Sequence, residues 1–375
     1  MRSVPILLLG LALPGLWAQS AQPVPLNTAD DYLRKGVLAQ QHNDLATAIE
    51  DYRKALAIDP KLADARANLG AALSAAGQFD AAIQEDTRAL AIAPGNLGIR
   101  MNLGLAYYKK GDMQNAHAAF EAVHAARPQD TSAAVLLGYS DIKLGKSSDA
   151  AAMLAPLENG RESNMDLEYV LGYALIDSGE ETQGLPRMEK VARATQSADA
   201  YFIAGSARLR RREFHEARAD LDAALNLHGN FPGIYTLAGQ ARDALGDTPA
   251  AQSAFEQALK LDPRDFTANL YLGAIKLKQR DLDTARPMLE LALQLQPNSP
   301  MARLQMAKLD GMTGKYSEAA GTLEELEKAD PSWLDPHVEL AAIYYKLHRP
   351  DDGQRERSIV EQIESRQQNA GPPRQ

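Results

Sequence analysis

A glycine returns every 34 residues through most of this chain, and that spacing constrains the fold more than any other feature. Counting one repeat from Ala63 puts Gly70 at its eighth place, which is glycine in eight of ten repeats and alanine in the other two. The step is 34 residues throughout, except for one of 33 between Gly172 and Gly205. A fixed period of this length indicates an array of short units, each packing on its neighbours.

Each repeat is predicted to form two helices. Apolar residues recur at helical spacing on both sides of Gly77, which suits a tight turn, and Pro94 at place thirty-two ends the second helix. The small residues at places eight and twenty are expected where the two helices pack closely, so that added methylenes would cost about 1–3 kcal/mol. This repeat-packing set comprises Gly36, Ala48, Gly70, Ala82, Gly104, Ala116, Gly138, Ala150, Gly172, Gly184, Gly205, Ala217, Gly239, Ala251, Gly273, Ala285 and Ala319.

The pattern resembles the tetratricopeptide repeat family, of an exported bacterial type, over roughly residues 29–362. Leu69-Gly70 match places seven and eight, Tyr107 matches place eleven, and Ala82 matches place twenty. Place twenty-four is usually large, but it holds Asp86 in the second repeat. Other departures are Arg357 at place twenty-four and Glu162, Gln196 and Gly229 at place thirty-two. The resemblance implies an all-α fold, a right-handed α-solenoid of about ten helix-turn-helix repeats that binds other proteins.

The repeats define the expected organisation of the chain. They begin near residues 29, 63, 97, 131, 165, 198, 232, 266, 300 and 334, giving a solenoid over 29–366. Residues 21–28 are expected to be a linker and residues 367–375 a disordered tail. Pro156 should shorten or bend the second helix of its repeat, and the polar stretch that follows makes residues 156–164 a candidate joint.

The first twenty residues are predicted to be a signal peptide. Arg2 precedes an apolar run over residues 4–17, and Ala18-Gln19-Ser20 has the small-x-small form of a cleavage site near Ser20 or Ala18. The alternative is a membrane anchor, but about 14 residues are too few for a span of about 20. We therefore expect an exported protein, periplasmic or secreted, with no transmembrane segment in the mature chain.

The concave wall of such a solenoid is the expected binding surface. In the family, it is lined by first-helix places two, five, nine, twelve and thirteen, which are aromatic and apolar in repeats three to six and polar or small in repeats one and two. Tyrosine is favoured at binding hot spots because its side chain combines a large contact area with a polar hydroxyl group. The alternative is that these side chains pack between adjacent first helices. The predicted partner groove comprises Met101, Leu105, Tyr108, Val135, Tyr139, Ile142, Tyr169, Tyr173, Ile176, Phe202, Leu209 and Arg210.

Nothing in the sequence predicts a catalytic, cofactor or metal site. The net charge of −9 disfavours nucleic acid, and the absence of cysteine excludes thiol chemistry and cysteine metal ligands. Gly145-Lys146-Ser147 lacks the earlier glycine of a phosphate-binding loop. The seven histidines are scattered, and His117 and His124 are too far apart along one helix to share a metal. The basic run at residues 208–212 is expected to face nearby acids, with an acidic partner as the alternative.

The expected function is therefore that of a non-catalytic scaffold for protein–protein interaction. It would hold a partner segment in its groove and serve envelope assembly, secretion or a surface polymer machine. A carbohydrate-binding solenoid and a regulatory subunit of an envelope enzyme are the alternatives. The sequence also leaves open an association with a membrane-bound complex.

Overall fold

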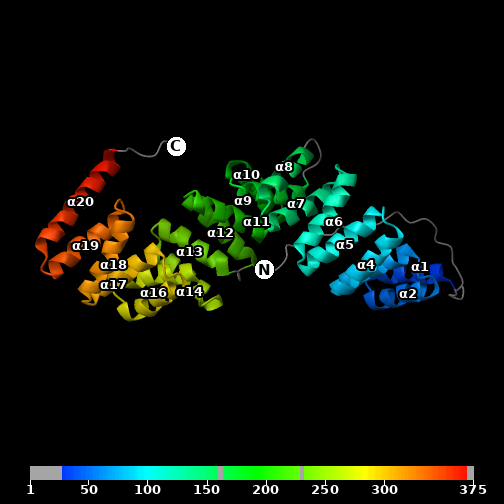
Figure 1. The fold of residues 1–375 in the computed structure, drawn as a ribbon, viewed down its shortest axis with the longest axis horizontal. Helices are drawn as coiled ribbons and strands as arrows, with labels where there is room; N and C mark the ends of the chain where they lie inside the picture. Colours follow the sequence, from blue (N-terminus) through cyan, green and yellow to red (C-terminus); the bar gives the residue numbers. More distant parts are fainter. Residues whose placement is uncertain (1–27, 159–163, 229–231, 370–375) are drawn as a thin grey trace. The chain divides into compact units, whose positions relative to one another are not determined.

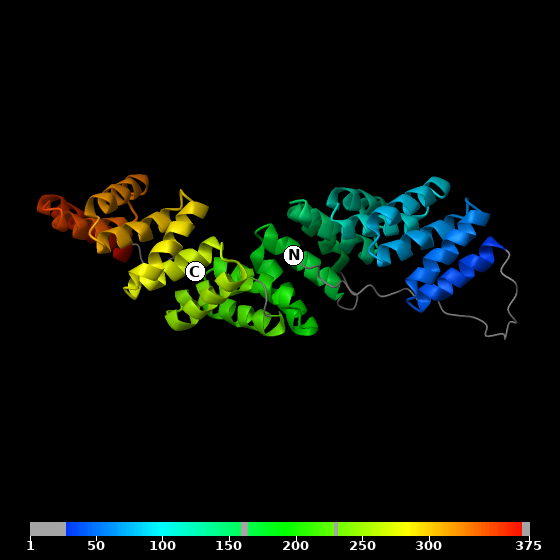
Figure 2. The ribbon, with the colours of Figure 1, turned by 90° about the horizontal axis from the view of Figure 1, so that it is seen from below.

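The computed structural model describes residues 28–158, 164–228 and 232–369, and these residues form an all-helical protein, as predicted. They contain twenty α-helices, one short 3₁₀-helix and no strand (Figure 1). Consecutive helices pair side by side across short turns, which Figure 2 shows from a second direction. The predicted signal peptide and nearly all of the predicted linker lie outside the described residues.

The described residues divide into two compact units, and the boundary between Ile203 and Ala204 falls inside one helix, α11 (Ala198–Arg210). The first unit contains α1 (Ala29–Gln41), α2 (Leu45–Ile58), α3 (Ala63–Ala75), α4 (Phe79–Ile92), α5 (Leu97–Lys110), α6 (Met113–Ala126), α7 (Thr131–Lys143), α8 (Ser147–Leu154), η1 (Ala155–Glu158), α9 (Met165–Asp177) and α10 (Glu181–Thr195). The second contains α12 (Phe214–His228), α13 (Pro232–Ala244), α14 (Thr248–Leu261), α15 (Phe266–Lys278), α16 (Leu282–Leu295), α17 (Pro300–Met312), α18 (Tyr316–Ala329), α19 (Leu334–Lys346) and α20 (Pro350–Asn369).

The turn inside each repeat is set by two consecutive places. Place fifteen has a positive φ in all ten repeats: it is glycine in six, for example Gly111 at +89°, and Asn43, Arg212, Arg280 and His348 in the others. Place sixteen is aspartate in several repeats, where its carboxylate accepts a hydrogen bond from a backbone N–H in the first turn of the second helix, as Asp112 does from Asn115. The left-handed residue reverses the chain and the cap begins the next helix.

The two helices of a repeat pack closely at place eight. A Cβ built on Gly104 would lie 2.6 Å from the Phe120 ring, and one built on Gly36 would lie 2.6 Å from the Tyr52 ring. In the fifth repeat both small places are glycine, and a Cβ on Gly184 would lie 2.7 Å from the carbonyl oxygen of Gly172. In six repeats the large side chain at place twenty-four lies against the glycine at place eight and fills the space that this glycine leaves open.

Neighbouring repeats are joined by a hydrogen bond that the family pattern does not state. A polar side chain at place four donates to the carbonyl of the proline six residues earlier. Arg66 donates to Pro60 at 2.8 Å, Asn269 to Pro263 at 3.0 Å, and His337 lies 3.1 Å from the oxygen of Pro331. The stop proline thus also supplies an acceptor that ties one repeat to the first helix of the next.

The fourth repeat has the short second helix that Pro156 predicts. The α-helix α8 ends at Leu154, and a 3₁₀ turn, η1, carries Pro156. The candidate joint at residues 156–164 lies partly outside the described residues and stays a prediction. At the C-terminus, the disordered tail was expected to begin at Gln367, whereas α20 continues to Asn369.

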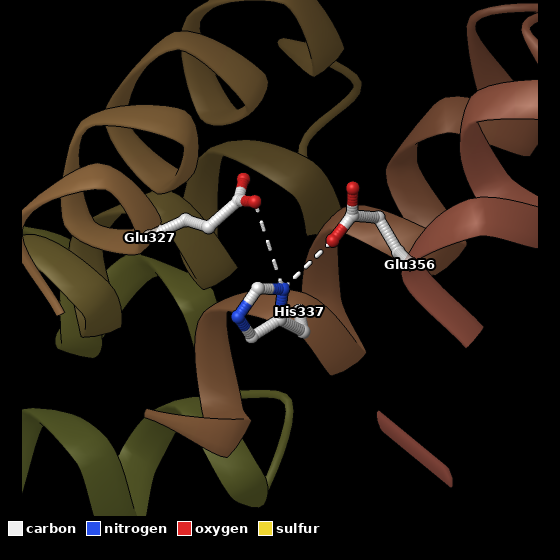
Figure 3. A group of neighbouring side chains, drawn as sticks. All are labelled: Glu327, His337 and Glu356. Atoms are coloured by element: carbon white, nitrogen blue, oxygen red, sulfur yellow. Dashed lines mark hydrogen bonds and ion pairs between the residues drawn. The ribbon is translucent and has the colours of Figure 1, made fainter. Parts of the chain in front are cut away.

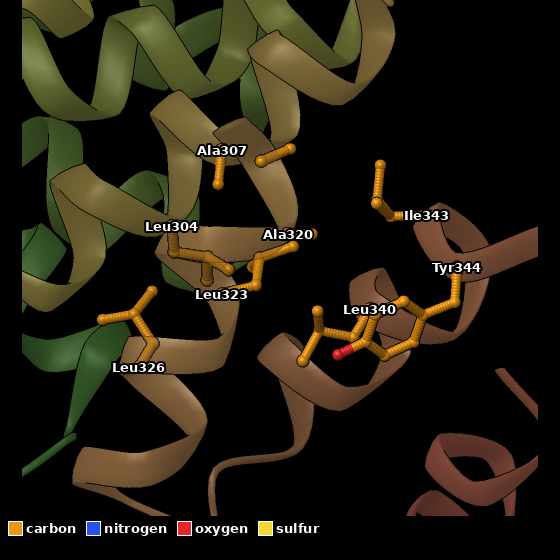
Figure 4. Packing of buried hydrophobic residues seen from close by; sticks show 9 residues of the cluster. Leu304, Ala307, Ala320, Leu323, Leu326, Leu340, Ile343 and Tyr344 are labelled. Atoms are coloured by element: carbon orange, nitrogen blue, oxygen red, sulfur yellow. The ribbon is translucent and has the colours of Figure 1, made fainter. Parts of the chain in front are cut away.

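The C-terminal core shows how the repeats share their apolar surfaces. Leu304 and Ala307 of α17, Leu323 and Leu326 of α18, and Leu340, Ile343 and Tyr344 of α19 form one buried cluster (Figure 4). Burying such side chains is the main stabilising contribution, because no single helix pair encloses a core of its own. No helix in the described ranges has the length and apolar character needed to cross a membrane.

Candidate functional site

The structure places much of the predicted central groove inside the first unit rather than on its surface. Met101, Leu105, Tyr108 and Tyr173 are half-buried. Five other residues are buried: Val135, Tyr139, Ile142, Tyr169 and Ile176. In α11, Phe202 and Leu209 are half-buried and Arg210 is exposed.

Ring contacts connect the central tyrosines. Tyr108 of α5 meets Tyr139 of α7 edge to face at 5.5 Å between centroids, and Tyr169 meets Tyr173 of α9 at 6.4 Å. The Nζ atom of Lys143 lies 5.0 Å from the centroid of Tyr139 and 5.8 Å from that of Tyr173. Burial raises the pKa of Tyr108 and of Tyr169 above the ordinary tyrosine value. Packing between first helices therefore accounts for Tyr139 and Tyr169, whereas Tyr173 and Lys143 form the accessible edge.

A hollow lies instead on the first helices of repeats one to three. Its volume is about 860 Å³, and α1, α3, α5 and the turn before α5 line it. Leu38 is 56% exposed here, and Asn68 and Asn102 occupy the same place in successive repeats. We call this surface the N-terminal hollow, lined by Leu33, Arg34, Val37, Leu38, Gln41, Asp64, Ala67, Asn68, Asn96, Gly98, Ile99 and Asn102.

Sequence reasoning missed the N-terminal hollow because it expected the flanks of the groove to be polar or small. The sequence did carry a signal for this surface in Leu33, Val37 and Leu38, at places five, nine and ten of the first repeat. An apolar residue at place ten, next to those at places five and nine, widens the apolar face of α1. Small side chains such as Ala67 leave the space open, so a lack of bulk in α3 helps to make the hollow.

The second unit has its own hollow on the corresponding face. It measures about 520 Å³, and α13, α15, α17 and α19 contribute residues to its wall, including Asp243, Tyr271, Lys278, Lys308 and Glu339. Lys308 pairs with Glu339 at 3.4 Å, and burial raises the pKa of Asp243 despite the opposing effect of Lys278. This surface is more charged than the N-terminal hollow.

The motifs that could suggest chemistry have structural roles. Gly145 has φ +75° in the turn of its repeat, and Ser147 donates a hydrogen bond to Asp177. In the basic run, Arg208 pairs with Asp220, and Arg211 pairs with Glu213 at 2.7 Å. Facing acids in the same chain thus account for these two arginines.

One cluster of potential metal ligands occurs in the described residues of the second unit, and sequence reasoning did not anticipate it. Glu327 of α18, His337 of α19 and Glu356 of α20 direct side-chain atoms toward one another, all within 4.8 Å (Figure 3). Their separations of ten and nineteen residues match no local metal motif. The available signal was His337, which stands at place four, where three other repeats carry tyrosine.

Comparisons with known proteins agree with the repeat pattern. Sequence models of the tetratricopeptide repeat match residues 41–77, 101–155, 236–300 and 276–343, together more than half of the chain. A tetratricopeptide repeat protein from Parabacteroides merdae shares the fold, with a TM-score of 0.51 and 16% identity over 71% of this chain and 98% of that one.

Two curated relatives match shorter stretches. Cellulose synthase operon protein C of Pseudomonas fluorescens is 30% identical over 94 residues, or 25% of this chain and 7% of that protein. The mitochondrial import receptor subunit TOM70 of Saccharomyces cerevisiae is 30% identical over 128 residues, or 32% of this chain and 19% of that protein. The chain thus matches only a small part of either relative. The chain belongs to the tetratricopeptide repeat family, whose members are protein-interaction scaffolds and generally not catalysts.

Proposed function

We propose that this protein is a non-catalytic scaffold that holds a segment of a partner protein in the N-terminal hollow. The observation that carries the proposal is the lining of that hollow, which comes from the first helices of three successive repeats and the turn before the third. Residues at one place in successive repeats face the same surface, so an extended segment meets equivalent groups at regular intervals.

The chemistry of the N-terminal hollow fits a peptide with apolar side chains. Leu33, Val37 and Leu38 offer an apolar wall, and burying one further leucine-sized side chain is worth about 1.5–3 kcal/mol. Asn68 and Asn102 offer amide groups, each of which can donate to and accept from a peptide backbone. The carbohydrate-binding alternative loses support, because burial of Tyr139 and Tyr169 removes two of the faces on which a sugar would stack.

A matched pair of exposed side chains tests this surface. Leu38 in α1 lies in the hollow and is 56% exposed, whereas Ile58 at the end of α2 lies outside it and is 51% exposed. Neither Leu38→Asp nor Ile58→Asp should change stability by more than about 0.5 kcal/mol, since both side chains are exposed. Partners recovered from the native host should be lost with Leu38→Asp and kept with Ile58→Asp.

Photo-crosslinking at the same two positions provides an independent measurement. A photoreactive residue at position 38 should form a crosslink to a partner. A photoreactive residue at position 58 should not crosslink to that partner. Equal trapping at both positions, or recovery of every partner by Leu38→Asp, would show that binding occurs elsewhere.

We also propose that the chain is exported, with cleavage after Ser20 or Ala18. The support is the order of Arg2, an apolar run and a small-x-small motif. An envelope role, in assembly, secretion or a surface polymer machine, is supported by the similarity of one stretch to a protein named for a cellulose synthase operon. Mass spectrometry of the native protein should find a chain that begins at Ala21 or Gln19. An intact Met1 would overturn export by this route.

A further inference from the structure

We propose that Glu327, His337 and Glu356 form a zinc site that holds the last helix, α20, against α18 and α19. The Nδ1 atom of His337 lies 2.7 Å from Oε2 of Glu356 and 3.9 Å from Oε1 of Glu327 (Figure 3). His337 and Glu356 are buried, and the side chain of Glu327 is 28% exposed. One nitrogen and two carboxylate oxygens thus converge from three helices, and solvent reaches the side chain of Glu327.

The other ring nitrogen of His337 is already occupied. Its Nε2 lies 3.1 Å from the carbonyl oxygen of Pro331, a contact that fixes the ring orientation when Nε2–H donates. Histidines that bind metals commonly donate their second N–H to a carbonyl or carboxylate in this way. The arrangement leaves Nδ1 as the atom that faces the two carboxylates.

The repeats of the same chain show which part of this cluster is structural. In the second repeat, Arg66 and Glu85 stand at the places of His337 and Glu356, pair at 2.6 Å, and Arg66 donates to Pro60. An ion pair and a bond to proline therefore suffice to hold such a repeat together. An arginine has no lone pair to offer a metal, whereas a histidine has one.

Glu327 is the second departure from the repeat pattern at this point. The equivalent of Glu327 beside the Arg66 pair is Leu56, which packs against the apolar core. Leu90, Leu225, Leu259 and Leu293 hold the same place in four other repeats, whereas Glu158 and Glu361 hold it in two, and Glu158 pairs there with Arg187 at 2.7 Å. A second carboxylate thus stands where an apolar side chain serves the fold, and it points toward Nδ1 of His337.

The distances require only small adjustments for zinc. Bonds of about 2.0–2.1 Å in tetrahedral geometry separate neighbouring ligand atoms by roughly 3.3 Å. Glu356 would retreat and Glu327 advance by roughly half an ångström each, and a water would supply the fourth ligand on the exposed side of Glu327. Magnesium and calcium prefer oxygen ligands alone, so the imidazole favours zinc. Two carboxylates also balance the charge of the ion.

The test is zinc titration of the full chain after chelator treatment, followed by calorimetry and by thermal melting. We expect one Zn²⁺ per chain, a raised melting temperature, and slower hydrogen exchange in α20. Glu327→Gln should weaken zinc binding by about tenfold or more. It should change the metal-free melting temperature little, since the 3.9 Å contact of Glu327 with His337 is much longer than the 2.7 Å contact that Glu356 makes.

Glu318→Gln is the matched control, because Glu318 is exposed on the same helix and lies outside the cluster. It should bind zinc as the unaltered chain does, which separates the loss of a zinc ligand from the loss of one negative charge on α18. Two results would overturn the proposal: no stoichiometric zinc on the unaltered chain, or equal zinc affinity in the Glu327→Gln variant.

Discussion

Asp86 is a buried acidic residue whose replacement should stabilise this protein. It holds place twenty-four of the second repeat, is fully buried, and has no hydrogen-bond partner for either carboxyl oxygen among the described residues. A Cβ built on Gly70 would lie 2.2 Å from Oδ1, so the carboxyl presses on the glycine that an apolar side chain covers elsewhere. Leu221 and Leu289 occupy the same place opposite Gly205 and Gly273. Asp86→Leu therefore copies a solution that the chain already uses.

The expected gain follows from the pKa of the carboxyl. Burial, with a smaller effect from the charge of Glu85, raises the pKa of Asp86 from 3.8 to about 8. At pH 7 the unfolded chain carries an ionised Asp86 and the folded chain a protonated one, so folding takes up a proton. About three pH units separate 3.8 from 7, and each is worth about 1.4 kcal/mol, which gives an upper limit of about 4 kcal/mol. We expect Asp86→Leu to raise the free energy of unfolding by about 2–4 kcal/mol at pH 7.

The sign of the pH dependence makes this prediction specific. Because the pKa of Asp86 is raised in the folded state, the free-energy cost of burying this carboxyl is absent below about pH 3.8, grows as pH rises, and levels off near pH 8. The advantage of leucine over aspartate should therefore be small at pH 4 and largest at pH 8. Asp86→Asn is the control, since it keeps the shape and cannot ionise; its difference from Asp86→Leu should not vary with pH.

Urea unfolding followed by circular dichroism at several pH values measures these differences, and titrations common to both chains cancel. A leucine variant less stable than the unaltered chain at pH 7 would refute the burial argument. A gain of the same size at pH 4 and pH 8 would refute the ionisation argument and leave packing as the cause.

Three further predictions concern the repeat framework. Gly314→Ala should destabilise the protein by about 1–2 kcal/mol because the φ angle of Gly314 is +85°. Gly321→Ala should stabilise it by about 0.5–1 kcal/mol, because Gly321 lies in a helix and an added Cβ would meet no other atom. Thermal melting of both variants distinguishes the effect of backbone conformation from that of added side-chain volume. Gly104→Ala should cost about 1–3 kcal/mol, because Phe120 has to move, and denaturant unfolding measures it. Deleting residues 334–375 should expose the core on α18 and cause aggregation, and a truncated chain that stays monomeric in light scattering would contradict that role.

The fold was predictable from the sequence because each structural requirement recurs. A positive φ at place fifteen, a small residue at place eight and a proline at place thirty-two leave marks at a fixed period. The hydrogen bond from place four to that proline was not predictable, because arginine, asparagine and histidine all supply the donor. An interaction that recurs at a fixed period cannot be recognised from residue types when several types can make it.

The binding surface was harder to predict for a related reason. Groove places and packing places lie on the same first helix, and Tyr139 shows that a large side chain at a groove place can be buried by the next repeat. A hollow depends on where neighbours are small, so Ala67 contributes to the N-terminal hollow as much as Leu38 does. Residue type alone does not separate these outcomes, because the contact depends on two adjacent repeats together.

The position of Asp86 relates stability to the candidate site. Asp86 lies in α4 and presses on α3, and α3 supplies Asp64, Ala67 and Asn68 to the N-terminal hollow. The cost of burying Asp86 falls on the pair of helices α3 and α4. This pair should therefore open more readily than its neighbours, because each repeat contributes to stability locally. Hydrogen exchange should therefore be faster in α3 than in α1 or α5, and Asp86→Leu should slow it there first, more at pH 8 than at pH 4. A uniform slowing across all the helices of the first unit would show instead that the unit opens as a whole, and that the middle wall of the hollow has no weakness of its own.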